Sequence, residues 1–189
     1  MIESIIGSLH DPVNIQKLVD LGLSEEMTTI LHEGVSAHIN DIDKLKKSTR
    51  GNNKSALDNP TDVIKMIRKW ESKGIIKQVD KAEAALILPL TMNYRYDHQT
   101  RRYKRRLCID CKPINAHIDC PPIKLPDLEY LSSQLSRGKY VALIDMESYY
   151  FHLRLKPEFA RYFCFEYVID GESKVFMMNC LPFGVNKVH

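Results

Sequence analysis

An aspartate follows a short apolar run, at a point where a carboxylate could bind a metal ion. Residues 140 to 144 are apolar and β-prone, which predicts a strand buried on both faces, and Asp145 comes directly after them. A carboxylate at the end of a buried strand is expensive to desolvate unless it is paired, and hard divalent cations prefer oxygen ligands. Three aromatic residues follow at positions 149 to 151. Two interpretations of Asp145 stay open, a metal ligand and an ordinary turn residue.

A second stretch whose residues could bind a ligand is strongly basic. Between Arg95 and Arg106 stand six Lys or Arg side chains and one acid, Asp97, so the local charge of +5 exceeds the +3 of the whole chain. Turn residues at 97 to 100 lie between two apolar runs, which predicts a β-hairpin with a basic, tyrosine-bearing tip. Phosphate binding and a merely solvated charged face are both compatible with this pattern.

Composition excludes several classes of protein. The chain is 44% hydrophobic and 27% charged, so it can bury a core, and its pI near 8.5 is compatible with a nucleic-acid partner. It has neither an apolar run of about 18 residues nor a basic, apolar leader, so we expect no membrane span and an intracellular location, cytoplasm or nucleus. Its five cysteines are odd in number and cluster late in the chain, which argues against a disulfide framework. Cys108-x-x-Cys111 could suggest zinc, but no second pair stands at finger spacing, so we expect buried or free thiols.

Residues 1 to 60 are expected to form a helical N-terminal region and a linker. Asp11-Pro12 and Ser24 are typical helix starts, and the polar, Asn-rich residues 46 to 60 predict an exposed loop and a domain boundary. The remaining elements are predicted from apolar periodicity and turn residues. They are helices over 61–73 and 127–138, a helical turn at 157–160, strands over 75–79, 84–92 and 151–155, and a hairpin around 170–171.

Three blocks in this order resemble the reverse transcriptases of retrotransposons and retroviruses. Residues 106–115 resemble the fingers segment, 143–153 the first palm motif, and 181–185 the start of the next palm motif. The Tyr-Phe-His order at 150–152 is similar to that of tyrosine-recombinase (DIRS-type) elements. The resemblance covers about residues 61 to 189 and implies an α+β fold, the fingers and partial palm of a right-hand polymerase.

The resemblance also implies roles for individual residues. Asp145 would be a catalytic ligand of Mg²⁺ or Mn²⁺ in two-metal nucleotidyl transfer. Four residues would bind the incoming deoxynucleoside triphosphate: Arg106, Tyr150, Phe183 and Gly184. Together with the basic stretch, the fingers segment would hold an RNA template and a DNA primer through Arg101, Arg102, Arg105, Asp110, Lys112 and Asn115.

One departure from the family concerns the second catalytic block. Reverse transcriptases carry a hairpin with two adjacent aspartates after the Leu-Pro-Phe-Gly block, and the 189 residues end at His189 without one. We therefore expect a polymerase fragment that is inactive alone. The alternative is a domesticated or remnant module that binds RNA or DNA without catalysis.

Overall fold

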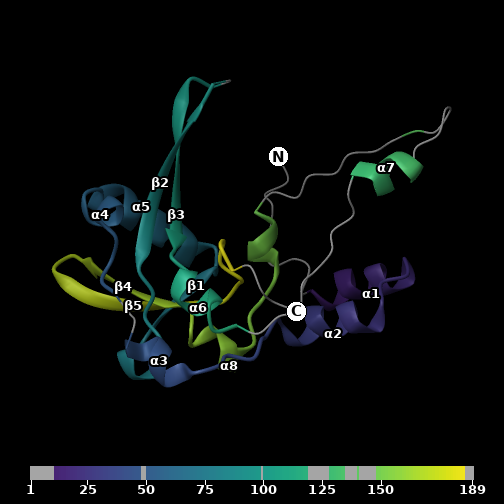
Figure 1. Ribbon diagram of the computed structural model, residues 1–189, viewed down its shortest axis with the longest axis horizontal. Coiled ribbons are helices and arrows are strands. Elements are labelled where there is room, and N and C mark those ends of the chain that lie inside the picture. Colours follow the sequence, from purple (N-terminus) through teal and green to yellow (C-terminus); the bar gives the residue numbers. More distant parts are fainter. Residues whose placement is uncertain are drawn as a thin grey trace.

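The computed structural model describes residues 11–47, 50–98, 100–118, 128–134, 140 and 148–185. It is a mixed α+β fold with two small antiparallel sheets, as the sequence predicts at this coarse level (Figure 1). Within the described residues, no helix is both long and apolar enough to cross a membrane.

Two short helices open the described chain. Helix α1 (Pro12–Asp20) begins where Asp11 Oδ1 accepts a hydrogen bond from the Val13 backbone N–H at 2.8 Å. Helix α2 (Glu25–Glu33) begins at Ser24, whose Oγ accepts from the Met27 N–H at 3.3 Å. Both starts confirm the sequence prediction, because a polar side chain satisfies an N–H that the helix itself leaves unpaired.

After α2 the chain crosses the body as an extended strap, residues 34 to 40. Gly34 has a φ of 94°, and a Cβ there would lie 3.0 Å from the Lys156 backbone nitrogen, so only glycine fits this close approach. Val35 then forms an isolated parallel bridge with Leu155, and Ile39 an antiparallel bridge with Ile118. Helix α3 (Ile42–Lys47) follows the strap.

The segment predicted as an exposed polar loop contains a helix, so that expectation is wrong over residues 54 to 57. Helix α4 (Lys54–Leu57) buries Ala56 completely. Asn52 Oδ1 accepts from the Leu90 N–H at 2.9 Å, and Ser55 Oγ accepts from the Met92 N–H at 3.1 Å. The polar residues are therefore partners for the backbone of a neighbouring strand. The domain boundary placed here stays a prediction.

The first sheet lies against helix α5 (Pro60–Ser72). Its strands are β1 (Ile76–Val79), β4 (Cys164–Ile169) and β5 (Glu172–Met178), in the order β1-β5-β4. Asp170 and Gly171 have φ values of 55° and 82°, which makes the predicted β4–β5 turn one of the tight hairpin type. Helix α5 buries Val63, Ile67 and Trp70, as its apolar spacing predicts.

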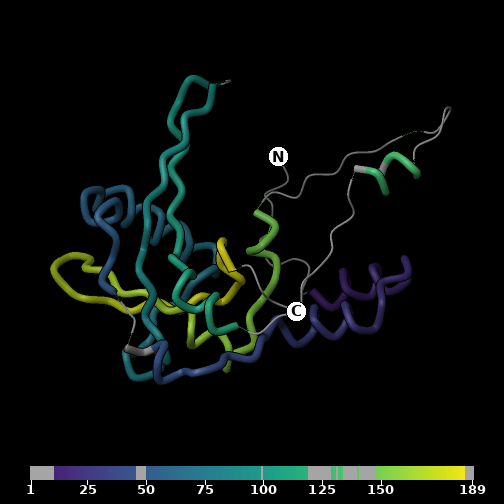
Figure 2. The backbone as a smooth tube through the Cα atoms, in the orientation of Figure 1, coloured from purple at the N-terminus to yellow at the C-terminus, as the bar shows by residue number. Residues whose placement is uncertain are grey.

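The second sheet is a long hairpin of β2 (Leu90–Asp97) and β3 (Arg102–Ile109) that projects from the body (Figures 1 and 2). The predicted basic hairpin is confirmed, although Lys104 pairs with Asp97 and Arg105 with Asp62. The strand predicted over 84–92 is wrong for its first half. A short 3₁₀ helix, η2 (Lys81–Glu83), and an isolated bridge at Ile87 precede Pro89, and regular pairing begins only after that proline, which cannot donate to a ladder.

The remaining elements connect the two sheets. They are α6 (Lys112–Asn115), α7 (Leu128–Gln134), the 3₁₀ helix η3 (Tyr149–His152) and α8 (Pro157–Ala160). The predicted strand over 151–155 is wrong. Phe151 and His152 are adjacent and both buried in η3, which an alternating strand does not allow, and Leu155 makes only an isolated bridge.

We predict that Phe165→Ala lowers the free energy of unfolding by about 3 to 5 kcal/mol, because it leaves a cavity in the core. Phe165 is 0% exposed, stacks on Phe176 at 5.4 Å and meets the edge of Trp70 at 6.4 Å. Urea denaturation followed by circular dichroism measures the change. Val168→Ala is the matched control on the same strand: Val168 is 58% exposed, so a loss above about 0.5 kcal/mol would contradict this account.

Candidate functional site

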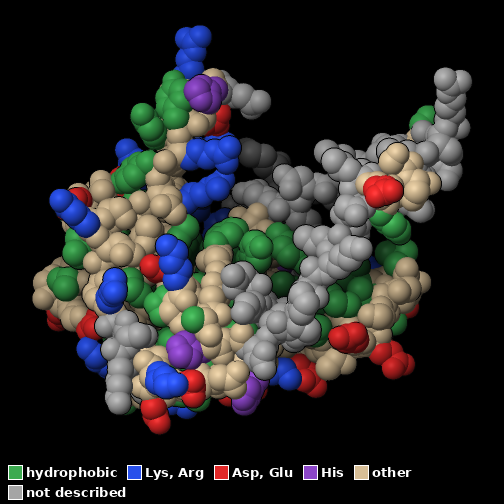
Figure 3. Space-filling view, viewed as in Figure 1, with side chains coloured by type: hydrophobic (Ala, Val, Ile, Leu, Met, Phe, Trp, Pro, Cys, Tyr) green, Lys and Arg blue, Asp and Glu red, His purple; other side chains and the backbone are tan. Residues whose placement is uncertain are grey.

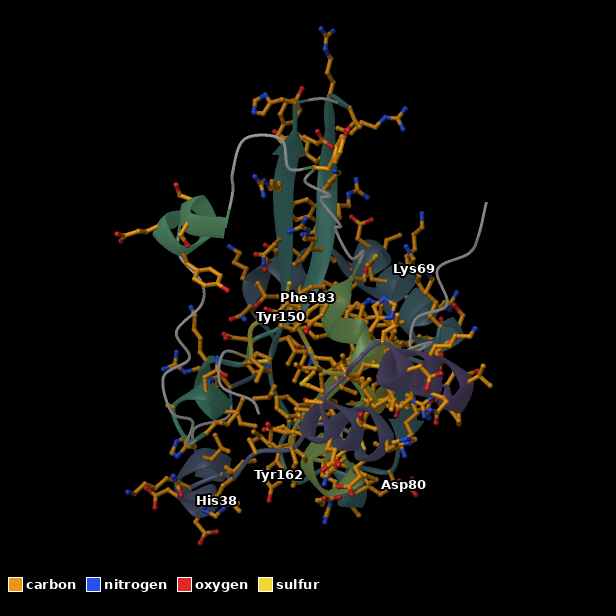
Figure 4. The ribbon with its side chains drawn as sticks, turned by 90° about the vertical axis from the view of Figure 1, so that its right-hand side faces the viewer. His38, Lys69, Asp80, Tyr150, Tyr162 and Phe183 are labelled. Atoms are coloured by element: carbon orange, nitrogen blue, oxygen red, sulfur yellow. The ribbon has the colours of Figure 1, made fainter. Side chains whose placement is uncertain are left out.

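A cleft of about 890 Å³ lies where the hairpin meets the body. Its walls come from β2 and β3, from the end of α5, and from residues 148–151 and Phe183. Figure 4 shows Tyr150 and Phe183 next to each other at the base of the hairpin. Segments that are far apart in the sequence therefore form one concave surface.

Cations dominate the polar lining of this cleft. They are Lys69, Lys73, Arg95, Lys104, Arg105 and Arg106, and no carboxylate from the described residues lines the cleft with them. Lys104 and Arg105 pair with Asp97 and Asp62, whereas within the described parts of the chain the other four have no acid at ion-pair distance. A cluster of this kind attracts an anion with several charges, such as a polyphosphate or a nucleic-acid backbone.

The strand register explains why Arg95, Lys104 and Arg106 face the cleft together. Arg95 is paired directly with Lys104, and Asn93 with Arg106, so these side chains share one face of the two-stranded sheet. Figure 3 shows Lys and Arg side chains gathered on the inner side of the hairpin, above a hollow in the surface.

Aromatic rings form the opposite wall. Tyr150 meets Phe183 edge-on at 5.3 Å, and Phe183 meets Phe151 at 4.9 Å. Phe151 continues to Trp70 at 5.7 Å, so ring contacts run from the cleft into the core. Tyr150 and Phe183 are each 37% exposed and Phe151 is buried, which presents two ring surfaces on a fixed support.

Helix α6 holds the Phe183 segment from behind. Asn115 Nδ2 donates to the Gly184 carbonyl at 2.7 Å, and the Cys111 thiol contacts the Phe183 carbonyl at 3.9 Å. Asp110 Oδ1 accepts from the Lys112 N–H at 3.1 Å and so fixes the start of α6. Gly184 has a φ of 95°, which favours glycine at this turn.

The predicted site residues fall into four groups. Arg105, Arg106, Tyr150 and Phe183 line the cleft together. Asp110, Lys112, Asn115 and Gly184 stand outside its lining, and Asn115 and Gly184 are joined by the hydrogen bond just described. Arg101 and Arg102 lie at the far end of the hairpin. Asp145 lies outside the described residues, as do residues 141–144 of the strand predicted before it. Tyr140, the first residue of that predicted buried strand, is fully exposed.

Sequence reasoning missed Lys69 and Lys73 as site residues. Lys69 precedes Trp70 near the end of α5, and Lys73 is the C-cap of that helix. At such positions a lysine is usually a solvated side chain. Their proximity in sequence to Trp70 is the only hint that they belong to a site. The structure shows the reason: the hairpin and the end of α5 line the same cleft. Arg95 and Lys104 were counted in the basic charge but not assigned to the site.

The described residues supply no divalent-metal site. They contain no group of three or more His, Cys, Asp or Glu side chains with metal-binding geometry, and the cleft lining is cationic. The role of Asp145 as a metal ligand therefore stays a prediction. Of the four cysteines that the structure describes, all free thiols, Cys111, Cys164 and Cys180 are buried, and Cys108 is half-buried at the cleft.

No protein-family model matches this chain, and no curated protein sequence matches it. The likeness to reverse transcriptases therefore rests on the residues of the chain itself.

We predict that iodoacetamide at pH 8 alkylates Cys108 about tenfold or more faster than Cys111 in the folded chain. Burial, followed by the nearby Asp110 charge, raises the pKa of the Cys111 thiol to about 12, so almost no thiolate forms. Burial raises the pKa of Cys108 as well, but part of that side chain reaches the cleft. Peptide mass spectrometry gives both rates. In urea the two thiols should react alike; equal rates in the folded chain would contradict the described packing around Cys111.

Proposed function

We propose that this chain is the fingers and partial palm of a reverse transcriptase from a retroelement, and that the cleft receives an incoming deoxynucleoside triphosphate. The observation that carries the proposal is the meeting of Arg106, Tyr150 and Phe183 in one cleft. Each of the three residues comes from a different one of the blocks that resemble the family. The proposal therefore does not depend on the resemblance of one block alone.

The charge of the cleft suits a triphosphate. Arg106 and Arg95 stand on the hairpin face that lines the cleft, and Lys69 approaches from α5. Guanidinium groups bind phosphate oxygens through two parallel N–H donors, and lysine adds a compact positive charge. Because several of these cations have no acidic partner among the described residues, the cleft should bind a polyanion more tightly than a neutral ligand of similar size.

The aromatic wall suits a sugar that lacks a 2′ hydroxyl. The Tyr150 ring is held against Phe183 at 5.3 Å, and Phe183 in turn against the buried Phe151 at 4.9 Å. A ring supported in this way cannot easily retreat, so it excludes an additional hydroxyl by steric contact. This is the role that the resemblance gives to Tyr150.

The same cleft and hairpin would contact the backbones of an RNA template and a DNA primer. Phosphate contacts by Lys and Arg supply most of the non-specific affinity for nucleic acid. In this proposal Asp145 is a ligand of Mg²⁺ or Mn²⁺ on the strength of the resemblance alone.

A second candidate is a module that binds nucleic acid without catalysis. The observation in its favour is the absence of any carboxylate among the described residues that line the cleft. The two candidates differ in sugar recognition, since a backbone-binding module has no reason to reject a 2′ hydroxyl on a nucleotide.

We predict that an RNA–DNA hybrid binds this chain with an affinity that falls steeply with salt, because each neutralised phosphate releases counterions. Replacing both Arg95 and Arg106 with alanine should reduce the log–log salt slope by about 1.5. Fluorescence anisotropy between about 50 and 200 mM salt measures it.

The matched control for this prediction removes the same charge elsewhere. Lys54→Ala with Lys65→Ala takes two exposed lysines from α4 and α5, neither of which lines the cleft. The proposal requires that the control keep most of the slope. Equal loss in both double variants would show that only the overall charge matters.

We predict that dATP protects Cys108 from alkylation at concentrations about tenfold or more below those of ATP, with Mg²⁺ present, because Cys108 lines the cleft and the Tyr150 ring disfavours a ribose. Tyr150→Ala should bring the two concentrations together, and Tyr150→Phe should keep them apart. Protection without sugar preference in the wild type would favour the non-catalytic module; no protection by either nucleotide would contradict nucleotide binding in the cleft.

A further inference from the structure

The two faces of the β2–β3 hairpin have different chemistry. Tyr96 is paired directly with Tyr103, and Tyr94 with Arg105. Since alternate residues point to opposite faces, these tyrosines lie on the face opposite Arg95, Lys104 and Arg106. Figure 3 shows the same division, with hydrophobic side chains on the outer side of the hairpin and basic side chains on its inner side.

Three rings cluster near the end of this outer face. Tyr96 meets Tyr103 edge-on with centroids 5.1 Å apart, and meets His98 at 5.0 Å. Tyr103 is 65% exposed and Tyr96 is 40% exposed. Rings this exposed contribute little to the core. Their edge-on contacts with one another hold a solvent-exposed aromatic surface in a fixed geometry.

Basic side chains stand beside this cluster at the tip. Arg101 has a φ of 51° in the turn itself. Arg102 opens β3 opposite Asp97, at the hairpin tip but on the same face as Lys104. Among the described residues neither arginine has an acid at ion-pair distance. The tip therefore combines exposed ring faces with positive charge, which favours a ligand that has both flat rings and negative charge.

We propose that this outer aromatic face, Tyr96, His98 and Tyr103, binds single-stranded nucleic acid by stacking its bases on the rings, while Arg101 and Arg102 at the hairpin tip hold the backbone. Stacking on aromatic side chains is available to every base, and adjacent cations hold the backbone. A duplex presents only base edges because its bases are already stacked on one another, so an unpaired strand is the ligand that this surface fits. The inference deepens the proposed function, and it rests on that proposal only for the binding of nucleic acid.

The site is separate from the cleft. Arg95 and Lys104, which line the cleft, are the chain neighbours of Tyr96 and Tyr103, but they point to the opposite face of the hairpin. None of the three rings, nor Arg101 or Arg102, lines the cleft. An unpaired template strand ahead of the cleft would meet the outer face, whereas the nucleotide would meet the inner one.

The test compares single-stranded RNA with an abasic strand of the same length and charge, by fluorescence anisotropy with the full chain. For the double variant Tyr96→Leu, Tyr103→Leu we expect about tenfold weaker binding to RNA or more, unchanged binding to the abasic strand and an unchanged salt slope. The matching Tyr→Phe double variant keeps both rings and should bind as the wild type does.

The charge is tested separately. Arg101→Gln with Arg102→Gln should reduce the salt slope by about 1.4 for both strands, since each phosphate contact to a single strand contributes about 0.7. Thermal melts check that all variants stay folded. The combination of a base-dependent loss from the tyrosines and a base-independent loss from the arginines is the expected result.

The other outcomes each overturn the proposal. Leu variants that bind RNA as tightly as the wild type would show that the rings do not stack on bases. Equal losses in the Leu and Phe variants would assign the effect to the hydroxyls. A wild type that dimerises in sedimentation through these rings would make the face a self-association surface. A wild type that binds neither strand would refute nucleic-acid binding itself, and with it the proposed function.

Discussion

The rest of the structure depends on a run of ring contacts that begins in the core and ends in the cleft. Phe176 stacks on Phe165 across the β4–β5 pair, and Trp70 meets both Phe165 and Phe151. Phe151 then supports Phe183, which supports Tyr150. The partly exposed rings of Tyr150 and Phe183 are held in place by their buried neighbours. The geometry of the site therefore depends on how the sheet packs against α5.

Polar contacts connect the hairpin and the cleft to the body. The side chains of Asn52 and Ser55 accept hydrogen bonds from the N–H groups of Leu90 and Met92, where β2 leaves the body. On the other side, Asn115 donates to the Gly184 carbonyl. These contacts satisfy backbone groups that would otherwise be unpaired at partly buried positions, and they set the direction of the hairpin relative to the aromatic wall.

Strand alternation gives one hairpin two surfaces. The inner face carries Arg95, Lys104 and Arg106 towards the cleft, and the outer face carries Tyr96 and Tyr103 to solvent. A shift of the register by one residue would exchange the two sets. The two faces of the hairpin therefore differ. The inner face presents positive charge to the cleft, and the outer face presents exposed aromatic rings to solvent.

The sequence by itself determined the α1, α2 and α5 starts, both hairpins and the basic stretch, because caps, turn residues and apolar spacing act over a few neighbouring positions. It also placed Arg106, Tyr150 and Phe183 among the site residues through a resemblance. Tertiary structure decided that residues 149 to 152 form a 3₁₀ helix, that α4 lies in a polar segment, and that Lys69 and Lys73 line the cleft. These features follow from contacts with partners distant in sequence, such as Phe183 for Phe151 and Leu90 for Asn52, and no local pattern encodes such a partner.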